Sequence, residues 1–289
     1  MQPYYLGLYE KAMPEETAWS EKLSCARECG YDFVEISIDE SPQRLSRLEW
    51  TVEQRRALVR AMEETGLPVR SMCLSGHRRY PMGASDPALR RRSMEIMSKA
   101  LDLADDLGIR TIQLAGYDVY YEPGTEQTRG LFEENLHRAA EMAAARGILL
   151  GFETMETAFM DTVGKSMYYV RTINSPYLGI YPDAGNLTNA AVLYGGNISA
   201  DMHAGAGHLL ALHLKPTKPG IFRNIQFDDM QQHVNFPEMV AAAWSLGVRR
   251  YVTELWSQGS PDWKAHIKTA NRVAREALDK QVRGSNNES

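Results

Sequence analysis

The sequence of 289 residues predicts a single (β/α)₈ barrel (TIM barrel), and three observations lead to this prediction. Short apolar runs alternate with amphipathic segments about eight times, which is typical of a parallel sheet with helical crossovers. The length is that of one such barrel. No GxGxxG motif follows the first run, which argues against an open dinucleotide-binding sheet. We expect one domain over residues 1–289, with a disordered polar tail at 283–289.

The strands are predicted from short apolar runs rich in β-forming residues. In chain order these are residues 4–9, 33–38, 69–75, 111–116, 147–156, 177–183, 209–215 and 251–256. Helices are predicted where apolar residues recur every three or four positions. The clearest are residues 15–28, 52–65, 89–107 and 128–145. Together these segments supply the alternation of strand and helix that the barrel needs.

Glycines and capping residues mark the expected ends of the helices. Thr51 and Asp86 are predicted N-caps, the second followed by Pro87 at the first helical position. Glycine accepts the left-handed conformation that often ends a helix, and six glycines follow helical patterns shortly before a strand. They are Gly30, Gly66, Gly108, Gly147, Gly207 and Gly247.

Each of the last four strand candidates carries one metal-capable side chain near its C-terminal end. These side chains are Glu153, Asp183, His213 and Glu254. The C-terminal ends of barrel strands surround one mouth, where the active sites of such barrels lie. Three carboxylates and one imidazole suit a single Mn²⁺, Mg²⁺, Co²⁺ or Zn²⁺ ion. The sequence therefore predicts one divalent metal ion at this mouth.

Composition argues against several other classes of protein. The net charge of -5 argues against a nucleic-acid binder, which normally carries a basic surface. No apolar run reaches the roughly 20 residues that cross a membrane, and the N-terminus does not read as a signal peptide. Cys25, Cys29 and Cys73 are too few for a disulfide framework. We expect a cytoplasmic protein that binds neither nucleic acid nor membrane.

Several longer stretches resemble one known family. They are LGLYEKAMP, FVEISIDES, RLSRLEW, SMCLSGHRRYPMG, IQLAGYDVYY, YPDAGNL and TKPG, and the resemblance extends over nearly the whole chain. Together with the order Glu, Asp, His, Glu on the last four strands, they resemble the L-ribulose-5-phosphate (L-xylulose-5-phosphate) 3-epimerases of pentose and ascorbate utilisation, in the xylose-isomerase-like barrel superfamily. The resemblance implies the same metal quartet, an isomerase that acts on a small sugar phosphate, and a homodimer.

Three features depart from the pattern that this family leads us to expect. Pro216 stands where an aspartate would follow Lys215, and Phe227-Asp228-Asp229-Met230-Gln231-Gln232 replaces a Gly-Glu-Gly-like turn. The segment 190–203 is a few residues longer. All three lie near the predicted mouth, so they bear on the choice of sugar rather than on the metal site.

The epimerase hypothesis assigns roles to particular residues. Glu153 and Glu254 are the candidate acid/base pair, because inverting the carbon next to a ketone takes a proton from one face and returns it to the other. A metal would stabilise the enediolate. Cations and hydroxyls near the mouth are candidate contacts to the sugar phosphate. They are Ser75, His77, Arg78, Arg79, Lys215 and Lys218, with Lys11 and Glu156 as second-rank candidates.

Three other functions remain open. An aldose–ketose isomerase of a sugar or sugar phosphate, like a hexulose-6-phosphate isomerase, could use the same metal site. A metal hydrolase such as an abasic-site endonuclease would need more histidines and a basic surface for DNA. A catalytically inactive barrel could serve as a sugar-phosphate sensor, although the intact quartet argues against it. The fold class does not decide between them.

Overall fold

The computed structural model describes residues 2–287, whose eight parallel strands form one curled sheet. In chain order they are β1 (Tyr5–Tyr9), β2 (Phe33–Ile38), β3 (Val69–Leu74), β4 (Thr111–Ala115), β5 (Leu149–Glu153), β6 (Leu178–Ile180), β7 (Leu212–Leu214) and β8 (Arg250–Thr253). They pair in the order β6-β5-β4-β3-β2-β1-β8-β7. Parallel bridges from Ile180 to Leu209 and from Asp183 to His213 close the ring. The predicted (β/α)₈ barrel is confirmed.

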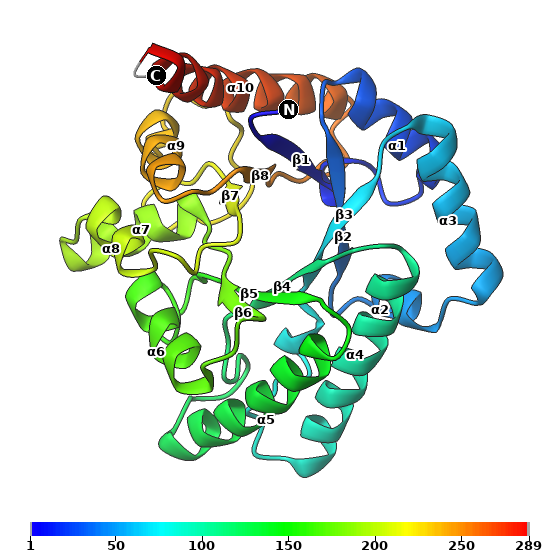
Figure 1. The fold of residues 1–289 in the computed structure, drawn as a ribbon, viewed down its shortest axis with the longest axis vertical. Helices are drawn as coiled ribbons and strands as arrows, with labels where there is room; N and C mark the ends of the chain where they lie inside the picture. The colour runs from blue at the N-terminus through cyan, green and yellow to red at the C-terminus, as the bar shows by residue number, and fades with distance from the viewer. Residues whose placement is uncertain (1, 288–289) are drawn as a thin grey trace.

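Helices surround the ring of strands on its outer side (Figure 1). They are α1 (Trp19–Glu28), α2 (Pro42–Leu45), α3 (Val52–Thr65), α4 (Pro87–Asp106), α5 (Glu126–Ala144), α6 (Val163–Ile173), α7 (Ala184–Tyr194), α8 (Ile198–Ala204), α9 (Phe236–Ser245) and α10 (Trp263–Asn287). Short 3₁₀ turns lie at Glu10–Ala12, Ser46–Glu49 and Gly76–Arg78. The helix α10 packs beside α9 and crosses near β1, so the two ends of the chain lie on the same side of the barrel (Figure 1).

The predicted helix boundaries are confirmed where a cap or a glycine defines them. The hydroxyl of Thr51 accepts a hydrogen bond from the Gln54 amide, and the Asp86 carboxylate accepts one from the Ala88 amide. All six glycines predicted to end helical patterns have φ between 64° and 86°. A side chain is strained in this left-handed region, which is why glycine is used there.

The first and the last helix differ from the sequence prediction. The first helix begins at Trp19 rather than at residue 15, because residues 15–18 form a turn ahead of the extended N-cap Ala18. The last helix, α10, continues to Asn287 and so includes residues 283–287 of the segment expected to form a tail. Residues 288 and 289, at the end of the predicted tail, lie outside the described residues.

Alternation along each strand separates two layers of side chains. On β2, Val34, Ile36 and Ile38 face the helices and join the large apolar cluster between sheet and helices. Phe33 belongs to a smaller cluster inside the barrel, and Glu35 lies in register with Tyr9 on the same inner face. Inward-facing residues near the strand C-termini therefore meet at the barrel mouth. None of the helices in the described part of the chain is long and apolar enough to cross a membrane.

Candidate metal centre at the barrel mouth

The four predicted metal ligands come together at the mouth. One potential ligand atom from each of Glu153, Asp183, His213 and Glu254 lies within 4.8 Å of the other three. Glu153 ends β5, His213 is the middle residue of β7, Glu254 directly follows β8, and Asp183 lies three residues beyond β6. All four side chains are buried. The cluster therefore has the residue types and spacing to hold one metal ion.

Asp183 is held in place by the start of the next helix. It is the N-cap of α7, and its Oδ1 accepts a hydrogen bond from the Asn186 amide at 2.7 Å. Its backbone amide donates to the hydroxyl of Thr154 at 3.0 Å. The second carboxylate oxygen, Oδ2, is buried and has no hydrogen-bond partner among the described residues. Because buried acceptors normally have a partner, this atom fits a metal ligand.

His213 presents its two ring nitrogens to different carboxylates. Nδ1 lies 3.1 Å from Oε2 of Glu254 and 3.8 Å from Oε1 of Glu153. Nε2 lies 2.6 Å from Oε1 of Glu35 on β2. Burial alone would lower the pKa of His213, but Glu35 and the two glutamates of the quartet outweigh burial and raise it well above its usual value.

Lys215 is the cation closest to the quartet. Its side chain extends from the strand end two residues beyond His213, and Nζ lies 3.1 Å from Asp183 Oδ1 and 3.7 Å from Glu254 Oε2. Nζ also donates a hydrogen bond to Oδ1 of Asn186 at 2.9 Å. One lysine beside three buried carboxylates leaves negative charge that a divalent cation would offset.

The carboxylates of the quartet differ in their proton affinity. Burial, together with the charge of Glu254, raises the pKa of Glu153. Burial raises the pKa of Asp183 to about 8 although Lys215 acts in the opposite direction. For Glu254, burial also favours the protonated form, but Lys215 and His213 outweigh it and hold the pKa below its usual value. The oxygen-rich donor set suits the hard or borderline divalent ions.

Five of the predicted substrate contacts line the cavity above the quartet. They are Lys11, Ser75, Arg78, Glu156 and Lys215. Arg78 lies over the rings of Tyr117 and Tyr120, with its Cζ 5.6 and 4.9 Å from their centroids. Both tyrosine hydroxyls donate to Glu156, at 2.6 and 3.2 Å. Arginine, aromatic rings and carboxylate thus form one connected wall of the cavity.

Three other predicted contacts do not line this cavity. His77 is buried, and its Nε2 lies 3.2 Å from the carbonyl oxygen of Ser93 on α4. Arg79 is exposed at the end of the same loop. Lys218 pairs with Asp229 at 2.8 Å and with Gln231 at 3.1 Å. These positions depend on the path of each loop, which residue spacing does not specify.

Several residues at the site were not predicted from the sequence. Asn186, Phe222, Arg223 and Trp256 line the same cavity, and Glu35 lies beneath it. Asn186 could have been inferred, because it follows Asp183 by three residues at the start of a helix. A fully buried glutamate is also unexpected in β2, where four of the six residues are apolar. Nothing in the sequence singles out Arg223, which lies in a loop.

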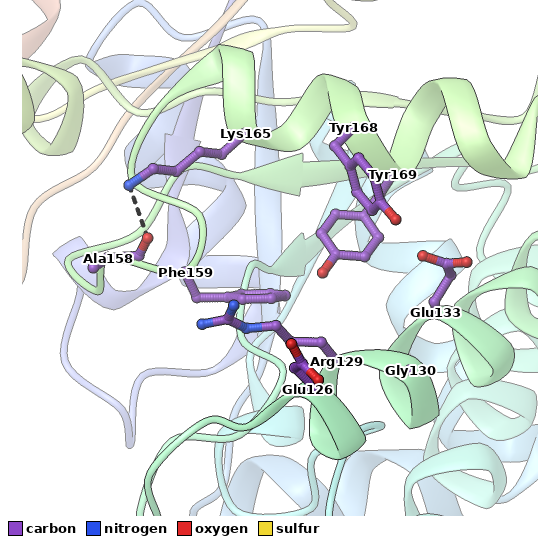
Figure 2. A pocket seen from close by; sticks show the side chains of 9 residues that line it. All are labelled: Glu126, Arg129, Gly130, Glu133, Ala158, Phe159, Lys165, Tyr168 and Tyr169. Atoms are coloured by element: carbon purple, nitrogen blue, oxygen red, sulfur yellow. Dashed lines mark hydrogen bonds between the residues drawn. The ribbon is translucent and has the colours of Figure 1, made fainter.

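A separate cavity of about 660 Å³ lies on the outer side of the barrel, between α5 on one side and α6 with the loop before it on the other (Figure 2). Arg129, Glu133, Phe159 and Tyr168 are among the residues that line it. Lys165 crosses one side, where its Nζ donates to the carbonyl oxygen of Ala158 at 2.8 Å (Figure 2). None of the residues around this cavity lines the barrel mouth.

Comparison with known proteins agrees with this architecture. The sequence profile of the xylose isomerase-like TIM barrel family matches residues 23–279. The chain is 43% identical over 266 residues to the L-ribulose-5-phosphate 3-epimerase UlaE of Escherichia coli, and the aligned region covers 92% of each chain. Identity and coverage are the same for the enzyme of that name from Escherichia fergusonii.

Solved structures show the same fold at lower identity. A structure of L-ribulose 3-epimerase aligns with a TM-score of 0.79 at 17% identity, covering 99% of this chain and 98% of that one. A D-psicose 3-epimerase from Clostridium cellulolyticum H10, solved with D-tagatose, aligns with a TM-score of 0.76 at 15% identity, covering 95% and 97%. Epimerases are isomerases. The chain belongs to the xylose isomerase-like TIM barrel family, among the L-ribulose-5-phosphate 3-epimerases, and is an enzyme of the isomerase class.

Proposed function

We propose that this enzyme inverts C3 of a ketopentose 5-phosphate and so interconverts L-ribulose 5-phosphate and L-xylulose 5-phosphate. The observation that carries the proposal is the convergence of Glu153 and Glu254 on one point from β5 and β8, with Asp183 and His213 between them. The name of the relatives at 43% identity supports the choice of substrate. The free oxygen of Asp183 and the acidic, oxygen-rich donor set support one Mn²⁺, Mg²⁺, Co²⁺ or Zn²⁺ ion as cofactor.

The two glutamates would act on opposite faces of the sugar. Inversion removes the C3 proton from one face and returns a proton to the other, so it needs two separate acid/base groups. A metal ion held by the quartet would supply Lewis-acid stabilisation of the negative charge that develops on the substrate oxygens. One of Glu153 and Glu254 would accept the C3 proton, and the other would donate a proton from the opposite side. Both carboxylates are buried, which limits proton exchange with water.

Lys215 and Asn186 would bind the substrate oxygens next to the reacting carbon. The ammonium and the amide are already in contact at 2.9 Å, and both line the cavity. A buried ammonium stabilises developing oxyanion charge more strongly than an exposed one. Their positions, Lys215 directly after β7 and Asn186 in the first turn of α7, suit binding and orientation of the ketose rather than proton transfer.

Arg223 and Arg78 are the favoured contacts for the phosphate group. The Arg223 side chain is 47% exposed, and its guanidinium nitrogen lies 3.8 Å from Glu156. Arg78 is fixed by the tyrosine rings, and Lys11 is paired with Asp39. A planar guanidinium can donate two parallel hydrogen bonds to a phosphate, which suits recognition at the open end of the cavity.

The proposal is tested by incubating the metal-loaded enzyme with L-ribulose 5-phosphate in D₂O and following the sugar by proton NMR. We expect L-xylulose 5-phosphate to form with deuterium at C3. Deuterium at C1 or C2 with formation of an aldose would favour the aldose–ketose isomerase instead. Glu153→Gln and Glu254→Gln are each expected to keep less than about 1% of the rate, because each loses a group that transfers a proton. Substantial epimerisation by either variant would exclude the two-glutamate mechanism.

A further inference from the structure

Glu35 is a buried carboxylate that belongs neither to the metal quartet nor to the lining of the mouth cavity. It lies in the middle of β2, and none of its surface is exposed. Its Oε2 accepts hydrogen bonds from the hydroxyls of Ser71 at 2.7 Å and Tyr181 at 3.0 Å. Its Oε1 lies 2.6 Å from Nε2 of His213. A buried carboxylate is costly unless it is paired in this way, so the arrangement calls for a functional explanation.

The contact with Glu35 distinguishes the two nitrogens of His213. An ionised carboxylate has no hydrogen to donate, so the hydrogen bond at 2.6 Å requires a hydrogen on Nε2. Nδ1 faces the carboxylates of Glu254 at 3.1 Å and Glu153 at 3.8 Å, so without an ion it carries a hydrogen as well. An ion bound at Nδ1 would replace that hydrogen and leave the neutral ring with its hydrogen on Nε2. Histidine ligands commonly donate their other N–H to a carboxylate, which fixes both tautomer and ring orientation.

Gln113 on β4 also contacts the ring, but it does not distinguish the nitrogens. Its amide nitrogen lies 3.2 Å from Nδ1 and 3.3 Å from Nε2. A donor at nearly equal distances from both atoms restrains the position of the ring without selecting a tautomer. Of these two polar contacts, Glu35 is therefore the one with the geometry to select it.

Tyr181 holds Glu35 and His213 together. Its ring packs edge-on against the imidazole, with centroids 5.0 Å apart and planes at 72°, while its hydroxyl donates to Glu35. Tyr181 reaches β2 across the barrel because β5 has a glycine at the adjacent position. A Cβ on Gly151 would lie 3.0 Å from the Cβ of Tyr181. His213 is thus supported by residues of β2, β3, β4 and β5 and by Tyr181, which directly follows β6.

We propose that Glu35 is a positioning residue for the metal centre: it fixes His213 as the tautomer with hydrogen on Nε2 and directs Nδ1 to the ion. Ser71 and Tyr181 keep the Glu35 carboxylate in place for this purpose. The inference rests on the metal site of the proposed function but not on the identity of the sugar. It predicts that replacing Glu35 weakens binding of the metal ion, although Glu35 does not line the substrate cavity.

The test measures Mn²⁺ binding by metal-stripped protein, by isothermal titration calorimetry and by the free-Mn²⁺ EPR signal. Glu35→Gln keeps the size of the side chain but can present either an acceptor or a donor to Nε2. We expect its Mn²⁺ dissociation constant to rise about 10- to 100-fold, the usual effect of losing the partner of a histidine ligand. Tyr181→Phe keeps the ring packing and removes one donor to Glu35, so we expect a rise of about 2- to 10-fold.

The histidine tautomer provides a second measurement, independent of activity. In Zn²⁺-loaded protein with ¹⁵N-labelled histidine, long-range ¹H–¹⁵N correlation should show His213 with hydrogen on Nε2 in the wild type and a loss of this single state in Glu35→Gln. Mn²⁺ affinity within twofold of the wild type, with the tautomer unchanged, would overturn the proposal and leave Glu35 a purely structural role. A metal-free Glu35→Gln variant that unfolds at a lower temperature but binds Mn²⁺ as tightly as the wild type would likewise show that Glu35 has a purely structural role.

The outcomes also separate this inference from the proposed function. In one outcome, the wild-type protein binds Mn²⁺, Glu35→Gln weakens this binding, and L-ribulose 5-phosphate is not epimerised. The proposed substrate is then wrong, and the positioning role of Glu35 stands. If Ser71→Ala, Tyr181→Phe and Glu35→Gln all bind Mn²⁺ as the wild type does while epimerisation is intact, the positioning role is wrong and the function stands. A wild-type protein that binds no Mn²⁺, Co²⁺ or Zn²⁺ would overturn both.

Discussion

The ammonium of Lys215 lies 3.1 Å from Oδ1 of Asp183, and both side chains are almost completely buried. The pair comes from neighbouring segments on either side of the junction between β6 and β7. It places a cation beside a metal ligand and at the wall of the substrate cavity at the same time. The lysine can therefore stabilise the carboxylates of the quartet and also reach the oxygens of a bound sugar.

Replacing this lysine should affect catalysis strongly. We expect Lys215→Met to lower kcat/KM for epimerisation by about 100-fold, because a charge-assisted hydrogen bond to developing oxyanion charge is lost. Lys218→Met is the matched control, since Lys218 pairs with Asp229 and does not line the cavity. The control should stay within about threefold of the wild type. Steady-state kinetics on the two variants give the comparison, and equal losses would contradict the assignment.

Removal of the metal should abolish activity and lower stability. Only the folded protein brings the four proposed ligands together, so an ion at 100 times its dissociation constant should add about 2.7 kcal/mol to the free energy of unfolding. We expect a chelator to stop epimerisation and to lower the melting temperature, and Mn²⁺ to restore both. Activity that survives exhaustive chelation would exclude the metal-dependent mechanism. The matched control is Asp183→Asn, which should show no shift in melting temperature with Mn²⁺.

Gly151 should be intolerant of alanine, because an added Cβ would lie 3.0 Å from Tyr181 Cβ and 3.1 Å from Leu210 Cδ1. We expect Gly151→Ala to destabilise the protein by about 1–3 kcal/mol, the usual cost of overpacking a core. Gly130 provides the control, since it lies within α5 and a Cβ there would meet no atom within 4 Å. Gly130→Ala should stabilise by about 0.4–1 kcal/mol. Urea denaturation measures the free energy of unfolding of both variants. The prediction requires Gly151→Ala to be less stable than Gly130→Ala, and the reverse order would contradict it.

His77 should make stability depend on pH. Burial lowers its pKa to about 4 from an ordinary value near 6.5. The unfolded chain therefore binds a proton more readily than the folded protein, and stability falls as the pH drops from 6.5 towards 4. Lowering the pH from 7.5 to 5.5 should therefore reduce the free energy of unfolding by about 1.3 kcal/mol through His77 alone.

Urea denaturation of the wild type and of His77→Gln at both pH values tests this dependence. The loss of stability on acidification should be smaller in His77→Gln by about that amount. His203→Gln replaces an exposed histidine at the end of α8 and is the control for a histidine-to-glutamine substitution as such. An identical pH dependence in His77→Gln and the wild type would show that His77 does not titrate in this way.

The sequence predicted the parts of the site that depend on strand position alone. In a parallel barrel, the C-terminal ends of all strands lie around one mouth, and this rule led to Glu153, Asp183, His213 and Glu254 as a group. Helix ends were predictable for a similar reason, because Gly66 and Thr51 act through local backbone geometry. The tail was predicted from polar composition alone, and composition does not show that residues 283–287 continue the long helix α10.

The loops and the support of the quartet were less predictable. His77, Arg79 and Lys218 have the charge and the sequence position of phosphate contacts, but the turn at Gly76–Arg78 directs His77 toward α4, and Lys218 finds a nearer partner in Asp229. Glu35 was overlooked because its partner His213 is 178 residues away in the chain. Contacts of this kind become visible only when the strands are arranged in space.

The junction between β6 and β7 gives the barrel one weak point. The other seven neighbouring strand pairs form ladders of at least three paired residues. This one depends on isolated bridges, including hydrogen bonds from Leu210 N to Ile180 O and from His213 N to Pro182 O. Local opening of the sheet should therefore begin there. Asp183 and His213 face each other across this gap, so an ion bound to both would slow the opening and protect the amides of Leu210 and His213 from hydrogen exchange. A bound ion would therefore strengthen the closure of the barrel at the pair of strands where it is held by the fewest hydrogen bonds.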